Sequence, residues 1–228
     1  MKKYYFTIAS ILVLASGITS CSNEETKTQN QVASRPSVPI LDTEVRIGNQ
    51  IWMTRNLNVS RYRNGDPIPQ VTSIIQWKNL TTGAWCYYNN DPANGAKYGR
   101  LYNWYAVNDP RGLAPIGWHV ASDSEWTTLT AFLGGEAVAG EKMKTTEGWS
   151  VPNLATNSSG LSSLPAGGRN FEGIFYNLGN YCDYWSTTNE TDASSEWAWI
   201  RFLIFNNTQA YRSASPKKGG LSVRCIKD

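Results

Sequence analysis

His119 is the single histidine of the sequence and lies in the stretch GWHVASDSEW, just before a helix start signal. Catalysis by an imidazole needs a nucleophile or a carboxylate beside it, and a zinc site needs further imidazoles or thiolates. A G-x-S-x-G motif, which would present a nucleophilic serine, is absent from the sequence. We therefore expect His119 to be structural and to satisfy local hydrogen bonds.

Acidic residues gather in the stretch DYWSTTNETDASSEW, which holds Asp183, Glu190, Asp192 and Glu196. Two carboxyl groups about 5–10 Å apart would suit a glycoside hydrolase. Closeness along the chain does not set that distance, so we expect a solvated loop at these acids, with a hydrolase as the alternative.

Oxygen-bearing side chains that could bind calcium also cluster, at Asn89, Asn90, Asp91, Asn94 and Asp109. Their spacing matches no EF-hand. Side chains of this type also bond to the backbone in tight turns, and that role explains them more simply. The sequence therefore predicts turns here, with no metal and no cofactor.

Tryptophan is abundant, with ten in the chain, and the stretch WCYYNNDPANGAKYGRLYNWYAV packs seven aromatic rings around turn-forming residues. Each ring can bury about 150–250 Å², so we expect most of them to form the interior and hold the loops in place. One or two rings at loop tips could stack on a sugar or anchor a protein partner. The candidates for ligand binding are Trp85, Trp185 and Trp197, and Trp85 is the ring of that stretch most expected to be exposed.

The elements that must position these residues are short. EVRIGNQIWM predicts a β-hairpin that turns at Gly48 and Asn49. The composition from Asn64 to Asn108 predicts long ordered loops. Ser122 and Glu125 form a capping-box pattern at the start of a helix that ends at two glycines, 134 and 135.

A second helix is expected at 137–144, followed by a buried strand in EWAWIRFLIF that turns back into TQAYR. The last segment, GLSVRCI, predicts a strand with Leu221, Val223 and Cys225 on the core face and Ser222 and Arg224 on the other. Helices and strands are segregated along the chain, which indicates an α+β fold.

The N-terminus begins with two lysines and an apolar stretch that ends in ITSC at Cys21. This is typical of a secretory signal, and ITSC resembles the lipobox of bacterial lipoproteins. The domains expected are a signal peptide (1–20), a lipidated Cys21 with a flexible tether (21–43), and one globular domain (44–228). The mature chain is nearly neutral, so no nucleic-acid partner is expected. The lipid would hold it to a membrane, and Glu24 and Glu25 resemble a signal for export to the surface of the outer membrane.

Six ordered motifs resemble the Fibrobacter succinogenes major paralogous domain family: IGNQIWMTRNL, WCYYNNDPANGAKYGRLYNWYAV, PIGWHVASDSEW, LPAGGRNFEGIFYNLG, YWSTT and SVRCIKD. The resemblance covers the chain from about Val45 to Asp228. The family is similar to C-type-lectin-like domains of the kind seen in formylglycine-generating enzymes. It implies a loop-rich, C-type-lectin-like α+β fold with two helices packed on small antiparallel sheets.

The resemblance also bears on the cysteines. The family's habitual cysteines look like Cys86 and Cys225, which implies a disulfide between them and leaves Cys182 unpaired. A copper(I) oxidase would need a pair of thiolates, and no such pair is recognisable. The sugar-binding EPN, QPD and WND motifs of calcium-dependent lectins are also missing.

These observations together predict a surface-exposed outer-membrane lipoprotein that is not an enzyme. Its domain would be a binding or adhesion module for a glycan or a protein. Two other classes stay open: a catalyst, either an oxidase that uses Cys182 or a hydrolase that uses the acidic stretch, and a structural subunit of a surface complex.

Overall fold

The computed structural model describes residues 43–228. The predicted signal peptide, Cys21 and all but the last residue of the predicted tether lie outside the described residues. The described chain forms five short helices: α1 (Ile74–Lys78), α2 (Pro92–Tyr98), α3 (Trp104–Val107), α4 (Asp123–Phe132) and α5 (Glu136–Met143).

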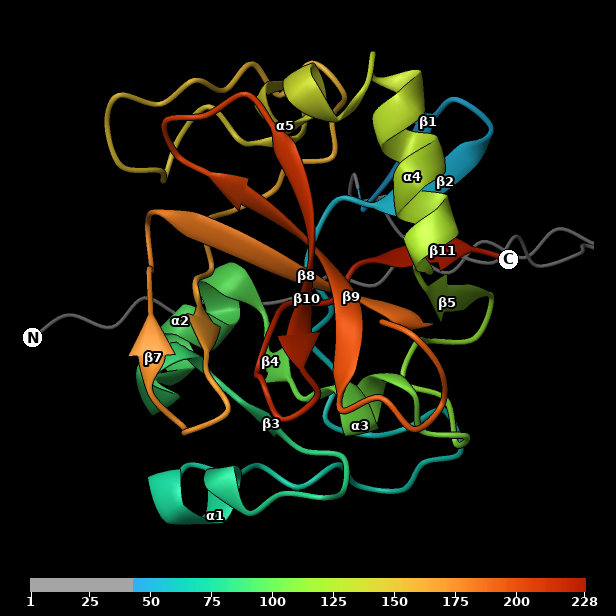
Figure 1. Ribbon diagram of the computed structural model, residues 1–228, viewed down its shortest axis with the longest axis vertical. Helices are drawn as coiled ribbons and strands as arrows, with labels where there is room; N and C mark the ends of the chain where they lie inside the picture. Colours follow the sequence, from blue (N-terminus) through green and yellow to red (C-terminus); the bar gives the residue numbers. More distant parts are fainter. Residues whose placement is uncertain (1–42) are drawn as a thin grey trace, which may run out of the picture. The chain divides into compact units, whose positions relative to one another are not determined.

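One sheet joins the two ends of the domain (Figure 1). Its strand order is β1-β2-β11-β5, with β1 (Glu44–Ile47), β2 (Gln50–Met53), β5 (Trp118–Val120) and β11 (Cys225–Lys227). The first two strands form the predicted hairpin, and Gly48 has a φ of 60° at its turn. Ile226 of the last strand pairs with Trp52 of the hairpin. The chain between them leaves this sheet twice, before and after β5.

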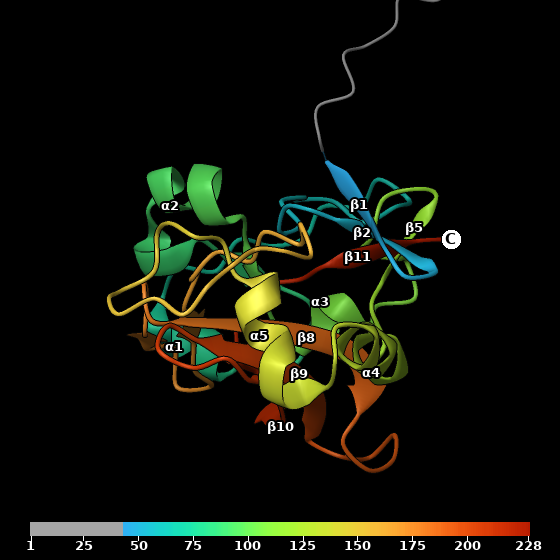
Figure 2. The same ribbon diagram turned by 90° about the horizontal axis from the view of Figure 1, so that it is seen from above.

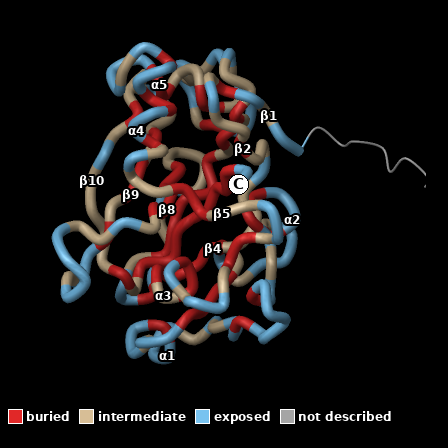
Figure 3. Tube along the Cα trace, turned by 90° about the vertical axis from the view of Figure 1, so that its right-hand side faces the viewer, coloured by how far each residue is buried: buried red, intermediate tan, exposed pale blue. Residues whose placement is uncertain are grey.

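A second antiparallel sheet, in the order β10-β9-β8, lies between two parts of the core. It consists of β8 (Tyr181–Asn189), β9 (Trp197–Ile204) and β10 (Ala210–Pro216), and it confirms the predicted buried strand that turns back on itself. Trp185 packs with Trp104 of α3, whereas Tyr184, its neighbour in sequence, packs with Trp126 of α4. Figure 2 shows α4 and α5 beside this sheet, and Figure 3 shows its buried centre.

The two smaller sheets hold the loops. One pairs β3 (Trp85–Cys86) with β4 (Leu101–Tyr102), and the other pairs β6 (Gly168–Arg169) with β7 (Phe175–Tyr176). The small antiparallel sheets and short ladders confirm a loop-rich α+β fold. The predicted segregation of helices from strands is wrong before α4, because α1, α2 and α3 alternate with β3, β4 and β5.

The capping box predicted for the longest helix is present. The hydroxyl of Ser122 accepts a bond from the amide of Glu125 over 3.3 Å, and the Glu125 carboxylate accepts one from the Ser122 amide over 2.7 Å. The second predicted helix, expected at 137–144, is α5 and begins and ends one residue earlier. The first of these helices was predicted from its capping box, whereas α5 starts at Gly135 without a side-chain cap.

The prediction of loops from Asn64 to Asn108 was incomplete, because α1, α2 and α3 lie in this range. Each has only four to seven residues, too few to show a periodic pattern. The side chains of Ser73, Asp91 and Asn103 accept backbone bonds at their N-termini. Some of the residues that predicted turns, such as Asp91 and Asn103, are therefore helix caps.

The aromatic stretch forms interior structure, as expected. Five of its seven rings are buried and the other two are half-buried. The indole N–H groups of Trp85 and Trp104 donate to the carbonyls of Ile68 and Ser186, each over 2.9 Å. Each ring thus fills the core while its polar edge holds a distant backbone segment. The buried rings are Trp85, Tyr88, Tyr98, Tyr102 and Trp104.

The closing strand does not alternate as predicted, because Ser222 and Arg224 are buried together with the core-facing residues. Arg224 donates to the carbonyls of Met53, Leu161 and Ser162 over 2.7–3.0 Å. The strand is enclosed on both faces, and its cation is satisfied by backbone oxygens.

Two more buried cations hold loops in the same way. Arg169 donates to the carbonyls of Val71, Thr72 and Gly173. Lys144 donates to three carbonyls between Ile204 and Asn207. A buried charge is tolerated only when it is paired or hydrogen-bonded, and here the partners are the loops themselves.

Candidate functional site

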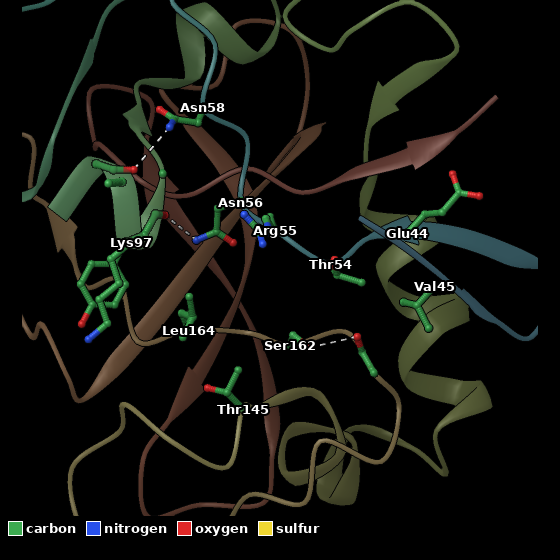
Figure 4. A pocket seen from close by; sticks show the side chains of 15 residues that line it. Glu44, Val45, Thr54, Arg55, Asn56, Asn58, Lys97, Thr145, Ser162 and Leu164 are labelled. Carbon is green, nitrogen blue, oxygen red and sulfur yellow. Dashed lines mark hydrogen bonds between the residues drawn. The ribbon is translucent and has the colours of Figure 1, made fainter. Parts of the chain in front are cut away.

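A cleft of about 790 Å³ lies beside the hairpin, within the size range of ligand sites (Figure 4). Its walls come from β1, the segment after β2, the C-terminal end of α2 and two loops around Thr145 and Ser162. No single element builds it. The lining residues are Glu44, Val45, Thr54, Arg55, Asn56, Asn58, Gly95, Ala96, Lys97, Tyr98, Gly99, Thr145, Gly160, Ser162 and Leu164.

The two asparagines of the lining hold the walls together. The Asn56 amide donates to the carbonyl of Tyr98 over 2.9 Å, and its oxygen accepts from Arg224 over 2.8 Å. Asn58 donates to the carbonyl of Gly95, and its oxygen accepts from Arg100. The segment after the hairpin is thereby fastened to α2.

Two hydroxyls of the opposite wall are engaged in the same way. Ser162 donates to the carbonyl of Gly160 over 3.2 Å and accepts from Asn157. Thr145 donates to the carbonyl of Glu147 over 2.8 Å and accepts from Trp149. These groups shape the loops that form the cleft.

The charged groups of the lining are arranged differently. Glu44 pairs with Lys227 over 2.9 Å. Within the described chain, the side chains of Arg55 and Lys97 form no hydrogen bond or ion pair, and Lys97 Nζ lies 4.9 Å from the ring centre of Tyr98. In the view of Figure 4, Arg55 lies between Lys97 and Glu44. The cleft thus offers two cations to a ligand.

The tryptophans predicted to bind a ligand do not come together. Trp85 and Trp185 are 5% and 0% exposed, so the prediction that they contact a ligand is wrong. Trp185 donates to the carbonyl of Tyr102, and the Arg100 guanidinium covers the Trp85 ring at 4.1 Å. Trp197 is 47% exposed at the start of β9 and remains a candidate, away from the cleft lining.

The disulfide implied for Cys86 and Cys225 is also wrong. Both are free thiols, and each lies in a different apolar cluster, Cys86 beside Trp77 and Cys225 beside Val120. Cys182 is free and buried too. Burial raises the pKa of all three thiols to about 12, which disfavours the thiolate that copper(I) binding requires.

His119 lies between two carboxylates. Its Nε2 is 2.7 Å from Glu125 and its Nδ1 is 2.8 Å from Asp228. Burial opposes the imidazolium, but hydrogen bonds to the two carboxylates outweigh it and raise the pKa of His119. The ring thus links β5 to α4 and to the last residue.

The acidic stretch does not form one solvated loop. Asp183 is 4% exposed in β8, where it accepts a hydrogen bond from Tyr176, so the expectation of a solvated residue is wrong for it. Asp192 and Glu196 are exposed and Glu190 is half-buried. Burial raises the pKa of Asp183 to about 6, although the bond from Tyr176 acts in the opposite direction.

The oxygen ligands considered for calcium are used locally. Asp91 accepts from the amide of Ala93 at the start of α2. Asn94 donates to the carbonyl of Tyr88, and Asp109 pairs with Arg111 over 2.8 Å. Asn89 and Asn90 adopt positive φ angles of 51° and 57°. Residues 43–228 hold no group of three or more His, Cys, Asp or Glu side chains that could hold a metal.

An exposed apolar patch forms a second candidate surface, which we call the isoleucine patch. Its members are Ile74 and Ile75 of α1 together with Phe171 and Ile174 of the β6–β7 turn, which are 46–75% exposed. A Cβ placed on Gly173 would lie 3.1 Å from the Cα of Ile74, so the two segments touch. Arg169 binds both segments and fixes the patch from below.

Sequence reasoning missed the cleft entirely. Arg55 and Lys97 stand 42 positions apart in stretches that predict a strand end and a turn. No motif joins them, and the wall opposite comes from 145 to 164. Their shared position results from long-range packing, for which a single sequence carries no signal.

Comparison with known proteins gives one match. The family model described as the Fibrobacter succinogenes major domain matches residues 45–227. Neither the curated proteins nor the solved structures include a match. In residues 43–228 no helix has the length and apolar character needed to cross a membrane.

Proposed function

The chain belongs to the Fibrobacter succinogenes major domain family, and on that premise we propose that it is a lipid-anchored envelope protein whose domain binds a glycan or protein ligand without catalysis. The observation that supports binding most directly is the cleft of about 790 Å³. Its lining contains one carboxylate, Glu44, and no histidine or cysteine. Such a set recognises a polar molecule but lacks the paired acids or activated nucleophile of a hydrolase.

The catalytic alternatives have less support. An oxidase would need an accessible thiolate, whereas Cys182 is fully buried with a raised pKa. A hydrolase would need two acids around a cleft, whereas Asp183 is enclosed between strands and Asp192 is exposed on a turn. Neither residue lines the cleft.

The proposed fold is C-type-lectin-like. Support comes from the sheet in which the first hairpin pairs with the last strand, while long, loop-rich segments on either side of β5 lie outside this sheet. We place the protein on the outer face of the outer membrane, and this proposal rests on the sequence around Cys21, Glu24 and Glu25. Cys21→Ser should release the protein from the membrane fraction, and retention of this variant would contradict the anchor.

A glycan array of the mature protein tests the binding proposal. Leu164→Trp adds bulk at the cleft wall and should abolish binding. Leu154→Trp makes the same exchange at a residue that is 45% exposed and does not line the cleft, so it should bind normally. Equal binding by both variants would place the ligand elsewhere, and Trp197→Ala would then test the exposed indole.

A second candidate function is a structural subunit of a surface complex, and the isoleucine patch favours it. Clustered exposed apolar side chains are characteristic of protein interfaces. Replacement of Ile75, which is 75% exposed, by Asp should release a co-purifying partner from detergent extracts. Val151→Asp alters a residue that is 84% exposed outside the patch and serves as the control.

A further inference from the structure

The cleft contains many polar side chains, but most are unavailable for a ligand's strongest contacts. Asn56, Asn58, Thr145 and Ser162 each bond within the walls. Thr54 also has a partner. A group that already bonds the backbone contributes shape, and it adds little new hydrogen-bonding energy when a ligand arrives.

The unused groups of the lining are positively charged. Within residues 43–228, the side chains of Arg55 and Lys97 have no hydrogen-bonding partner, and both residues are exposed. The one acid, Glu44, is 2.9 Å from Lys227 and is thereby neutralised. An anionic ligand would therefore find two free cations and no free carboxylate in this cleft.

The remaining lining suits a sugar ring. Val45, Ala96 and Leu164 supply apolar surface beside the polar side chains. Sugars combine apolar C–H faces with polar rims, and a carboxylate or sulfate on the rim would bond Arg55 in a charge-assisted manner. The guanidinium fork matches the planar carboxylate geometry.

We propose that the cleft binds an acidic saccharide, with its carboxylate or sulfate held by Arg55 and Lys97. This inference rests on the proposed binding function and adds the ligand class. A polynucleotide is disfavoured, because its evenly spaced phosphates call for an extended basic surface whereas the mature chain is nearly neutral.

Calorimetry of the full-length protein with three probes tests the proposal: trigalacturonate, a sulfated heparin tetrasaccharide and neutral maltotriose. The two acidic probes should bind, more weakly as salt rises, and maltotriose should bind at least about tenfold more weakly. The double variant Arg55→Gln/Lys97→Gln should weaken acidic binding about tenfold or more.

The matched control is Lys78→Gln/Lys218→Gln, which removes the same charge from residues that do not line the cleft. It should leave the affinity unchanged. An equal loss in this control would mean that net charge alone attracts the ligand, and the proposal would fail.

The remaining outcomes distinguish a wrong ligand class from a wrong binding function. If maltotriose binds as well as the acidic probes and Leu164→Trp abolishes its binding, the cleft binds glycans but the inferred acidity is wrong. If no saccharide binds, both proposals fail. Tighter binding of a single-stranded oligonucleotide, lost in Arg55→Gln/Lys97→Gln, would overturn the assignment to a saccharide.

Discussion

The hydroxyl of Tyr176 donates a hydrogen bond to Oδ2 of Asp183 over 2.6 Å. This contact joins β7 to β8 and encloses a carboxyl group that the acidic stretch alone gave no reason to expect inside. Burial raises the pKa of Asp183 to about 6 from 3.8. Burial, followed by the charge of Asp183, also raises the pKa of Tyr176. The pair therefore makes folding stability depend on pH.

Asp183→Asn should reveal this dependence. Because the folded pKa is raised, the carboxyl's contribution to stability is present below pH 3.8 and is lost as pH rises through about 6. The variant does not titrate, so its free energy of unfolding should gain about 2 kcal/mol relative to wild type between pH 4 and pH 7. Urea titrations at several pH values measure the gap. Glu196→Gln, at an exposed acid, is the control, and a gap that does not vary with pH would contradict the assignment.

His119→Gln should remove a contribution to folding stability that, like that of Asp183, decreases as pH rises. The pKa of His119 is raised above 6.5, so its contribution is fully present below that pH and disappears as pH rises through the folded pKa. The side chain is 40% exposed, so we expect less than about 1 kcal/mol. In chemical denaturation, wild type should have a higher free energy of unfolding than the variant at pH 5.5 but not at pH 8.5. A larger gap at pH 8.5 would rule out this account.

Arg224→Met should destabilise the domain by about 3 kcal/mol or more, because several buried oxygens lose their donor at once. It should also weaken ligand binding, since Arg224 holds Asn56 and the carbonyl of Ser162 in the cleft walls. The control is Arg61→Met, where an exposed guanidinium donates to the carbonyl of Gly65 alone. Thermal unfolding of both variants measures the loss of stability. Equal melting temperatures would contradict a stabilising role for the buried Arg224 hydrogen bonds.

A thiol count tests both the anchor and the absence of the implied disulfide. The folded protein should react negligibly with Ellman's reagent, since Cys86, Cys182 and Cys225 are buried with raised pKa values. In denaturant the lipidated protein should yield three thiols, with Cys21 blocked as a thioether. A single thiol in denaturant would show that Cys86 and Cys225, or another pair, are joined.

The sequence was most informative where a residue's partners lie close along the chain. The capping box joins Ser122 and Glu125, three positions apart, and satisfies backbone amides at the start of the helix. The hairpin turn likewise depends on its own residue, Gly48, which adopts a positive φ. The helices α1 to α3 were not predicted, because helices of four to seven residues are too short to show a periodic pattern. Their caps have the composition of ordinary turns.

The family, the α+β class and the interior role of the aromatic stretch could all be predicted from the sequence, because local chemistry and motif order suffice for them. Tertiary structure alone decided which tryptophans are exposed, which thiols are separated, and that Asp183 is enclosed. It also brought Arg55 and Lys97 into one cleft. The physical reason is that burial and free charge depend on what packs against a side chain, and those neighbours come from distant segments.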